Sequence, residues 1–120
     1  MRQLSRRAVV AGLLALCLAG PSLAGPAKGP VRLVGLVQGF QSVSAKLTFQ
    51  PGQPAVVKIE GDGDTALALV ILDARGRRVA ADTRKADQLT VRWTPRSREP
   101  YSIVVVNRGG VPNRFVMRSN

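Results

Sequence analysis

The chain has 120 residues, a net charge of +11, no histidine and one cysteine. These counts exclude an intrachain disulfide and any catalysis or metal binding that depends on histidine. The sequence also lacks a phosphate-binding glycine loop, zinc-ligand spacing and the aromatic and basic signature of nucleic-acid modules, so we expect no nucleic-acid partner.

Residues 1–24 have the three-part layout of a secretory signal peptide. Arg2, Arg6 and Arg7 precede an apolar block at residues 8–20, and residues 22–24 (SLA) end in a cleavage site with small side chains. The apolar block is shorter than the roughly 20 residues that a membrane-spanning helix needs. We therefore expect cleavage after Ala24, a periplasmic or extracellular bacterial location, and no transmembrane anchor after cleavage.

The sequence leaves two export routes open. Arg6 and Arg7, followed by two valines, resemble a twin-arginine signal, but paired arginines also occur in general secretory signals. Leu16 precedes Cys17 where a lipidation signal has a small residue. We therefore expect Cys17 to leave with the signal peptide.

The mature chain is predicted to be one domain without cysteine. Its 96 residues carry 15 Lys and Arg against 7 Asp and Glu, a net charge of +8. Residues 25–30 are a flexible lead-in rich in Pro and Gly, and residues 31–120 form the domain. A charge of this size attracts anionic partners.

Eight segments of the mature chain are predicted to be strands. In chain order they are 31–37, 42–49, 55–60, 66–73, 78–82, 89–94, 100–107 and 113–118. In the first of them, Gly35 indicates a bulge. The clearest is 42–49, where Val43, Ala45 and Leu47 alternate with polar residues.

Turn residues separate these segments. Residues 50–53 (QPGQ) predict a type II turn and a hairpin that joins 42–49 to 55–60. Residues 73–77 predict a short hairpin with Gly76 in the left-handed conformation. Turn signals recur every 8 to 12 residues, and no apolar period of 3.6 is sustained in the mature chain. The pattern predicts an all-β, antiparallel β-sandwich of about eight strands.

Several motifs follow one another in an order typical of a known family. They are residues 61–65 (GDGDT), Asp73 with Gly76, 79–82 (VAAD), 93–95 (WTP), 101–107 (YSIVVVN) and 113–115 (NRF). Over about two-thirds of the mature chain, the sequence resembles the bacterial pre-peptidase C-terminal domain family. The resemblance implies a jelly-roll-like sandwich that acts as a non-catalytic accessory in secretion, supports an exported partner, or binds protein or carbohydrate surfaces.

The resemblance also raises the question of calcium. Some relatives have acidic residues where this chain has Ala66 and Ala68, and those residues can help to hold a calcium ion. The remaining candidate ligands are carboxylates: Asp62, Asp64, Asp73 and Asp82. Calcium needs six to eight oxygen ligands. The alternative is that each aspartate accepts hydrogen bonds within its own turn, so no cofactor is predicted beyond a possible calcium ion.

Three aromatic residues have two interpretations. Trp93, Tyr101 and Phe115 could stack on a sugar ring, or they could belong to the core. Strand alternation places Trp93 on the face of Leu89 and Val91, with the core residues. We therefore expect core packing.

An apolar stripe is predicted on a nominally outer face. If alternate residues of the strand 66–73 face the core, the others face outward, and a second strand adds to them. The stripe consists of Ala66, Ala68, Val70, Leu72, Val104 and Val106. Such a stripe calls for a cover, which is a partner protein, a second copy of the chain, or the segment 31–37.

A basic cluster is the candidate for anion binding. It comprises Arg75, Arg77, Arg78, Arg84, Lys85, Arg92, Arg96 and Arg98. One interpretation is that it binds anionic lipid or glycan of the cell envelope. The other is a solvated surface, because Asp73, Asp82, Asp87 and Glu99 lie among these residues.

Catalysis is not expected. Ser42 with Lys46, or Ser102 with a lysine, could form a serine–lysine pair, but both serines lie within predicted strands and have no nucleophile elbow. The sequence thus predicts an exported non-catalytic module for protein–protein interaction or structural support in the cell envelope. A binder of anionic envelope components or glycans is the alternative.

Overall fold

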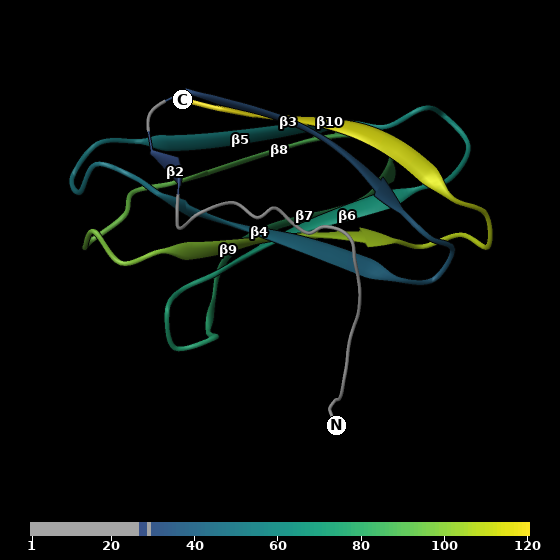
Figure 1. Ribbon diagram of the computed structural model, residues 1–120. Coiled ribbons are helices and arrows are strands. Elements are labelled where there is room, and N and C mark those ends of the chain that lie inside the picture. Colours follow the sequence, from purple (N-terminus) through teal and green to yellow (C-terminus); the bar gives the residue numbers. More distant parts are fainter. Residues whose placement is uncertain (1–26, 29) are drawn as a thin grey trace.

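The computed structural model describes residues 27, 28 and 30–120, which form nine strands in two sheets packed face to face (Figure 1). The predicted signal peptide and residues 25, 26 and 29 of the lead-in lie outside the described residues. Within the described part, no helix is long and apolar enough to cross a bilayer.

The two sheets form the upper and lower layers of Figure 1. The four-stranded sheet has the order β3 (Val31–Val37), β10 (Asn113–Ser119), β5 (Ala55–Glu60) and β8 (Gln88–Trp93). The five-stranded sheet has the order β2 (Ala27–Lys28), β4 (Ser42–Thr48), β9 (Tyr101–Asn107), β6 (Leu67–Leu72) and β7 (Arg78–Ala86). Neighbouring strands are antiparallel, except that β2 runs parallel to β4. The predicted antiparallel sandwich is confirmed.

Strand alternation builds the core between the sheets. On β6, Leu67, Leu69 and Ile71 are completely buried, and on β9 the residues Ile103 and Val105 are buried opposite them. Burial of each such aliphatic side chain contributes about 1.5 to 3 kcal/mol. Because alternate residues share a face of a strand, the same pattern sends the intervening residues to the outer faces.

One strand is longer than predicted. The segment predicted at 78–82 continues as β7 to Ala86, although its pairing with β6 has two register shifts. The polar residues 83–85 show no apolar alternation, so the sequence pattern placed the end of the strand too early. Asp82 and Arg84 stabilise this extension through the hydrogen bonds described below.

The predicted hairpin between 42–49 and 55–60 is wrong. The turn itself forms, since Gly52 has a φ of 79° and Gln53 N–H donates to the Gln50 carbonyl at 3.3 Å. However, β4 pairs with β9, whereas β5 pairs with β8 and β10 in the other sheet. The chain therefore crosses between layers at this turn, because turn residues reverse the chain locally without selecting its partner strand.

Gly35 is not a bulge. The pairing of β3 with β10 is continuous, and Gly35 lies opposite Phe115. A Cβ atom at position 35 would lie 2.5 Å from Cζ of Phe115. Glycine is required there because the Phe115 ring packs against the backbone of the neighbouring strand.

Candidate functional site

Three connections meet at one end of the sandwich, at the right of Figure 1: residues 38–41, 61–66 and 108–112. Two completely buried asparagines hold them together. Asn107, at the end of β9, donates from Nδ2 to the carbonyl oxygens of Val37 at 3.1 Å and Val111 at 2.7 Å. Its Oδ1 accepts the Gly109 N–H at 3.0 Å. One amide thus fixes both flanking connections.

Asn113, at the start of β10, does the same for the connection between β5 and β6. Its Nδ2 donates to the hydroxyl and the carbonyl oxygen of Thr65, at 3.0 and 3.2 Å. Its Oδ1 accepts the Asp62 N–H at 3.1 Å. Because both asparagines are buried with their amides satisfied, this end of the molecule is rigidly organised.

Phe40 stands out on these connections. It has a φ of 57°, the left-handed conformation that bulky residues avoid, and its side chain is 73% exposed. Its N–H donates to the Gly109 carbonyl at 2.8 Å, and its ring lies beside Gly110, where a Cβ atom would come within 3.2 Å of the ring. Val111, which is also exposed, follows Gly110 on the connection 108–112. We call Phe40 and Val111 the Phe40 platform.

Strain at an exposed aromatic residue marks a functional site more strongly than exposure alone. A turn needs no phenylalanine, and the backbone strain here is maintained by the contacts of the neighbouring connection. Phe40 is not among the site residues predicted from the sequence. The available signal was an aromatic residue after Gly39, in a four-residue turn outside the strand alternation.

The predicted apolar stripe lies on the outer face of the five-stranded sheet. Val70 pairs with Val104, and Ala68 pairs with Val106. The segment 31–37 was one of the predicted covers for this stripe. It does not cover the stripe, because it forms β3 in the other sheet. Most of the stripe is half-buried, but Ala68 is only 5% exposed.

Arg108 partly covers the stripe. Its N–H pairs with the Ala66 carbonyl, and its Nη1 donates to the Thr83 carbonyl on β7 at 3.0 Å. The side chain therefore reaches from the end of β9 to β7, past the intervening strand β6.

The four candidate calcium ligands are far apart along the fold. Asp62 and Asp64 precede β6, Asp73 follows its other end, and Asp82 lies within β7. In the part of the chain that the structure describes, no three His, Cys, Asp or Glu side chains gather into a metal site. The four carboxylates do not form one set of calcium ligands among the described residues, so calcium binding stays a prediction.

Asp73 accepts hydrogen bonds within its own turn, whereas Asp62 serves its own turn and also β10. Asp62 accepts the N–H groups of Arg114 at 2.9 Å and of Asp64 at 3.0 Å, which lower its pKa below the usual value. Asp73 accepts the N–H groups of Arg77 and Arg75, each at 2.9 Å, and its pKa is lowered in the same way. Gly76 closes this hairpin with a φ of 78°, as predicted.

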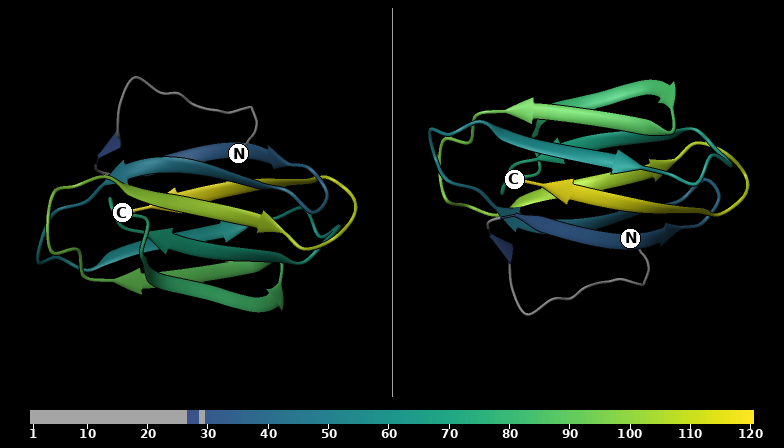
Figure 2. Two further views of the ribbon diagram at one scale, coloured as in Figure 1. Left: turned by 90° about the horizontal axis from the view of Figure 1, so that it is seen from below. Right: turned by 90° about the horizontal axis from the view of Figure 1, so that it is seen from above.

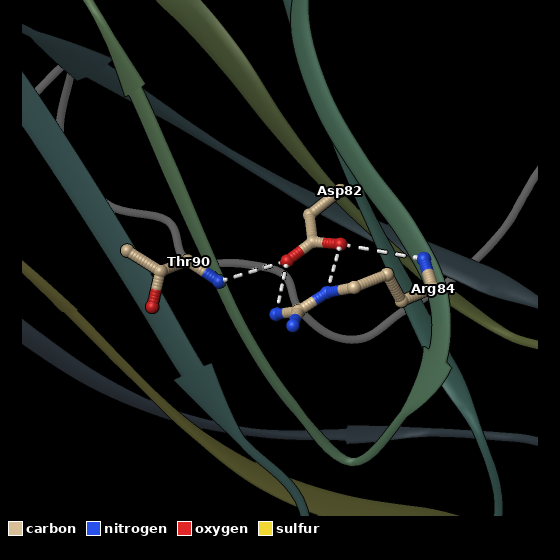
Figure 3. Close-up of polar contacts among 3 residues, drawn as sticks. All are labelled: Asp82, Arg84 and Thr90. Carbon is tan, nitrogen blue, oxygen red and sulfur yellow. Dashed lines mark hydrogen bonds and ion pairs between the residues drawn. The ribbon is translucent and has the colours of Figure 1, made fainter.

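Asp82 connects the two sheets at their edge strands (Figure 3). Its carboxylate accepts Nε and Nη2 of Arg84 at 2.9 and 2.8 Å, and the backbone N–H of Thr90 on β8 at 3.3 Å. The Arg84 guanidinium is the largest cause that holds the pKa of Asp82 below its ordinary value. This carboxylate therefore acts as a structural link between β7 and β8.

The predicted basic cluster is spread over several surfaces. Arg75, Arg77 and Arg96 line an open groove of about 620 Å³ that Asp73 and Glu99 also line. Arg77 pairs with Asp73 at 3.4 Å, so the groove is partly neutralised. Arg84 pairs with Asp82, and Arg92 points outward from the four-stranded sheet. The remaining members are exposed: Arg78, Lys85 and Arg98.

Trp93, Tyr101 and Phe115, the aromatic residues with two interpretations in the sequence, pack in or against the core. Phe49, Trp93 and Tyr101 pack edge to face at the opposite end of the sandwich, with ring centroids 4.9 to 6.3 Å apart. Phe115 is buried against Gly35. Ser102 lies opposite Lys46 on the outer face of β9 and β4, where Lys46 is exposed to solvent. A base desolvated in a pocket, which a serine–lysine hydrolase needs, is not formed by this pair.

No protein-family model matches the sequence, and no curated protein matches it by sequence. The fold is similar to the crystal structure of Aeromonas hydrophila PliG, a periplasmic lysozyme inhibitor of g-type lysozyme. The match has a TM-score of 0.53 and 12% sequence identity, and it covers 84% of this chain and 93% of that chain. At this identity the likeness shows a shared fold. The resemblance to pre-peptidase C-terminal domains stays a prediction.

Proposed function

We propose that this protein is an exported, non-catalytic module that binds a partner protein through the Phe40 platform. The observation that carries the proposal is the left-handed, exposed Phe40 held on connections that two buried asparagines organise. The predicted signal peptide supports a periplasmic or extracellular location.

The energetics favour recognition. A non-glycine residue in the left-handed region costs about 1 to 2 kcal/mol, and an exposed phenyl ring adds apolar surface that water solvates poorly. A partner pocket that buries the ring recovers about 2 kcal/mol of transfer free energy. Because the platform is already ordered, little conformational entropy is lost on binding. An aromatic anchor in a preformed position is typical of a binding hot spot.

The structural neighbour supports the class of function. PliG is described as an inhibitor, which acts by binding an enzyme, and as periplasmic. This supports a protein partner and a location in the envelope for the present chain. It also makes g-type lysozyme a first candidate partner to test.

Site-specific photo-crosslinking tests the proposal in the exporting cell. A photoreactive residue replaces Phe40, and a matched control replaces Gln53, which is exposed on the turn between β4 and β5 at the other end. We expect a discrete protein adduct from position 40 that excess wild-type protein competes away. Equal adducts from both positions would refute a specific platform.

A lysozyme assay names or eliminates one partner. If g-type lysozyme is the partner, the wild-type protein inhibits it and the Phe40→Asn variant does not. An absence of inhibition would eliminate this enzyme and leave the crosslinked adduct to identify the partner.

A further inference from the structure

The outer face of the four-stranded sheet carries cations in register. Figure 2, right, looks onto this sheet, with β10 between β3 and β5. Arg118 on β10 lies directly opposite Arg32 on β3 and Lys58 on β5. Three positive side chains therefore form one row across three adjacent strands, about 4.8 Å apart.

The whole face is positively charged. Its outward Lys and Arg side chains, all exposed, are Arg32, Lys58, Arg92, Arg114 and Arg118. The one outward carboxylate on these strands is Glu60, whose Oε1 lies 3.9 Å from Nη1 of Arg118. On the four strands themselves, five positive charges against one negative leave a surplus of four; the Asp62 carboxylate, on the connection after β5, borders the face at Arg114. We call this surface the basic face.

Such a row is unfavourable in the isolated molecule. Like charges directly opposite each other on neighbouring strands destabilise a sheet. Glu60 pairs weakly with Arg118 alone, and Arg32 and Lys58 have no ion pair within the described residues. An external anionic surface would neutralise the row and remove the repulsion.

Aliphatic side chains lie beside the cations. In the next row, Val34 pairs with Val116, and beyond it Leu36 lies opposite Arg114. Val34 is 54% and Leu36 is 43% exposed, on an edge strand. The basic face thus combines long cationic side chains with aliphatic ones and has no aromatic residue.

We propose that the basic face docks onto the surface of a bilayer that contains anionic phospholipid. Protein-binding hot spots concentrate on aromatic anchors in pockets, whereas this face spreads its charge over four strands. Mobile headgroups can gather under separated cations, and each Lys or Arg near an anionic bilayer contributes about fivefold in affinity. Val34 and Leu36 can enter the headgroup boundary from the sheet edge.

The basic face is a different surface from the Phe40 platform, and a bilayer is a different partner from a protein. The Phe40 platform lies at the end of the sandwich, and the basic face is one of its broad sides. A bilayer under the basic face would leave the platform at the rim. An experiment can therefore disprove binding at one of these surfaces and leave the proposal for the other intact.

Vesicle co-sedimentation tests the proposal. The vesicles are phosphatidylcholine alone or phosphatidylcholine with about one-third phosphatidylglycerol. The test variant is Arg32→Gln/Lys58→Gln/Arg118→Gln. The control variant is Arg75→Gln/Arg78→Gln/Arg98→Gln, which removes the same charge from exposed residues elsewhere.

We expect the wild-type protein to bind the anionic vesicles and to release them as salt rises. The test variant should bind about a hundredfold more weakly, and the control only a few-fold more weakly. The test variant should melt at the same temperature as the wild type or above it, since a row of like charges is removed. This melting curve also shows that the variant is folded.

Three results would overturn the proposal. The first is equal binding of the wild type to both kinds of vesicle. The second is an equal loss in the test and control variants, which would show that net charge alone matters. The third is binding to soluble polyglutamate but not to anionic vesicles, which would indicate an acidic protein partner.

Discussion

The two ends of the sandwich are closed by different chemistry. At one end, Phe49, Trp93 and Tyr101 pack edge to face. At the other, the buried side chains of Asn107 and Asn113 hold three connections by hydrogen bonds. The loops at the aromatic end also carry hydrogen bonds, from the Gly52 N–H to the Pro95 carbonyl at 3.0 Å and from Asn120 Nδ2 to the Pro54 carbonyl at 2.9 Å, but the side chains that close this end are packed apolar rings. Hydrogen bonds are directional, and Phe40, the one non-glycine residue with a positive φ among the described residues, is held at the asparagine end.

The aromatic end should carry the larger share of stability. We expect Trp93→Ala to lower the free energy of unfolding by about 3 to 5 kcal/mol through lost burial and a cavity. Trp93→Phe is the matched control. Within the described residues, the buried indole Nε1 has no hydrogen-bond partner, so the control loses packing area but no hydrogen bond. Urea unfolding measures both, and a cost below about 1 kcal/mol for Trp93→Ala would show that the ring is not part of the core.

The asparagine end should respond locally. Asn107→Ala leaves the Val37 and Val111 carbonyls and the Gly109 N–H without their partner, so we expect a loss of about 2 to 3 kcal/mol. Amide hydrogen exchange at Phe40 and Gly109 should accelerate more than exchange near Tyr101. Uniform acceleration at both ends would contradict the division between them.

The link between β7 and β8 predicts a pH dependence. The Arg84 guanidinium lowers the pKa of Asp82 in the folded state, so the ionised carboxylate stabilises the fold above the unfolded pKa of about 3.8. This contribution is lost as the pH falls from there through the lowered folded pKa. Asp62 and Asp73 have lowered pKa values and act in the same direction.

Asp82→Asn should therefore flatten the fall in stability below about pH 4. At neutral pH we expect it to cost about 1 to 2 kcal/mol, because hydrogen bonds from a charged partner are lost. Unfolding free energies between pH 7 and pH 2 measure both effects. A variant whose stability still falls as steeply as that of the wild type would assign the acid sensitivity to the other two aspartates.

Local and non-local structure were not equally predictable. The alternation on β6 and β9 predicted correctly which residues face the core, because a period of two depends only on the strand itself. The sheet to which β5 belongs was mispredicted, because it depends on pairing with β8 and β10, which are distant in sequence. The role of Gly35 likewise depends on Phe115, 80 positions later.

The candidate site was less predictable still. The left-handed conformation of Phe40 depends on two distant residues. The Gly109 carbonyl accepts the Phe40 N–H, and Gly110 lies beside the Phe40 ring. The row of cations on the basic face depends on the register of three strands. A single sequence shows the arginines and the phenylalanine, but their relationships arise only when distant strands pair.

Phe40 should show the smallest effect on stability and the largest on binding. Asparagine tolerates the left-handed conformation, so we expect Phe40→Asn to change the free energy of unfolding by less than about 1 kcal/mol, or to raise it. The same substitution should weaken binding of the crosslinked partner by at least about 2 kcal/mol, if the ring is a hot spot. Phe40→Ala removes the ring but keeps the strained backbone, which separates the two effects. If Phe40→Asn destabilises the fold as strongly as Asn107→Ala does, the ring contributes to folding, and its exposure would not mark a binding site.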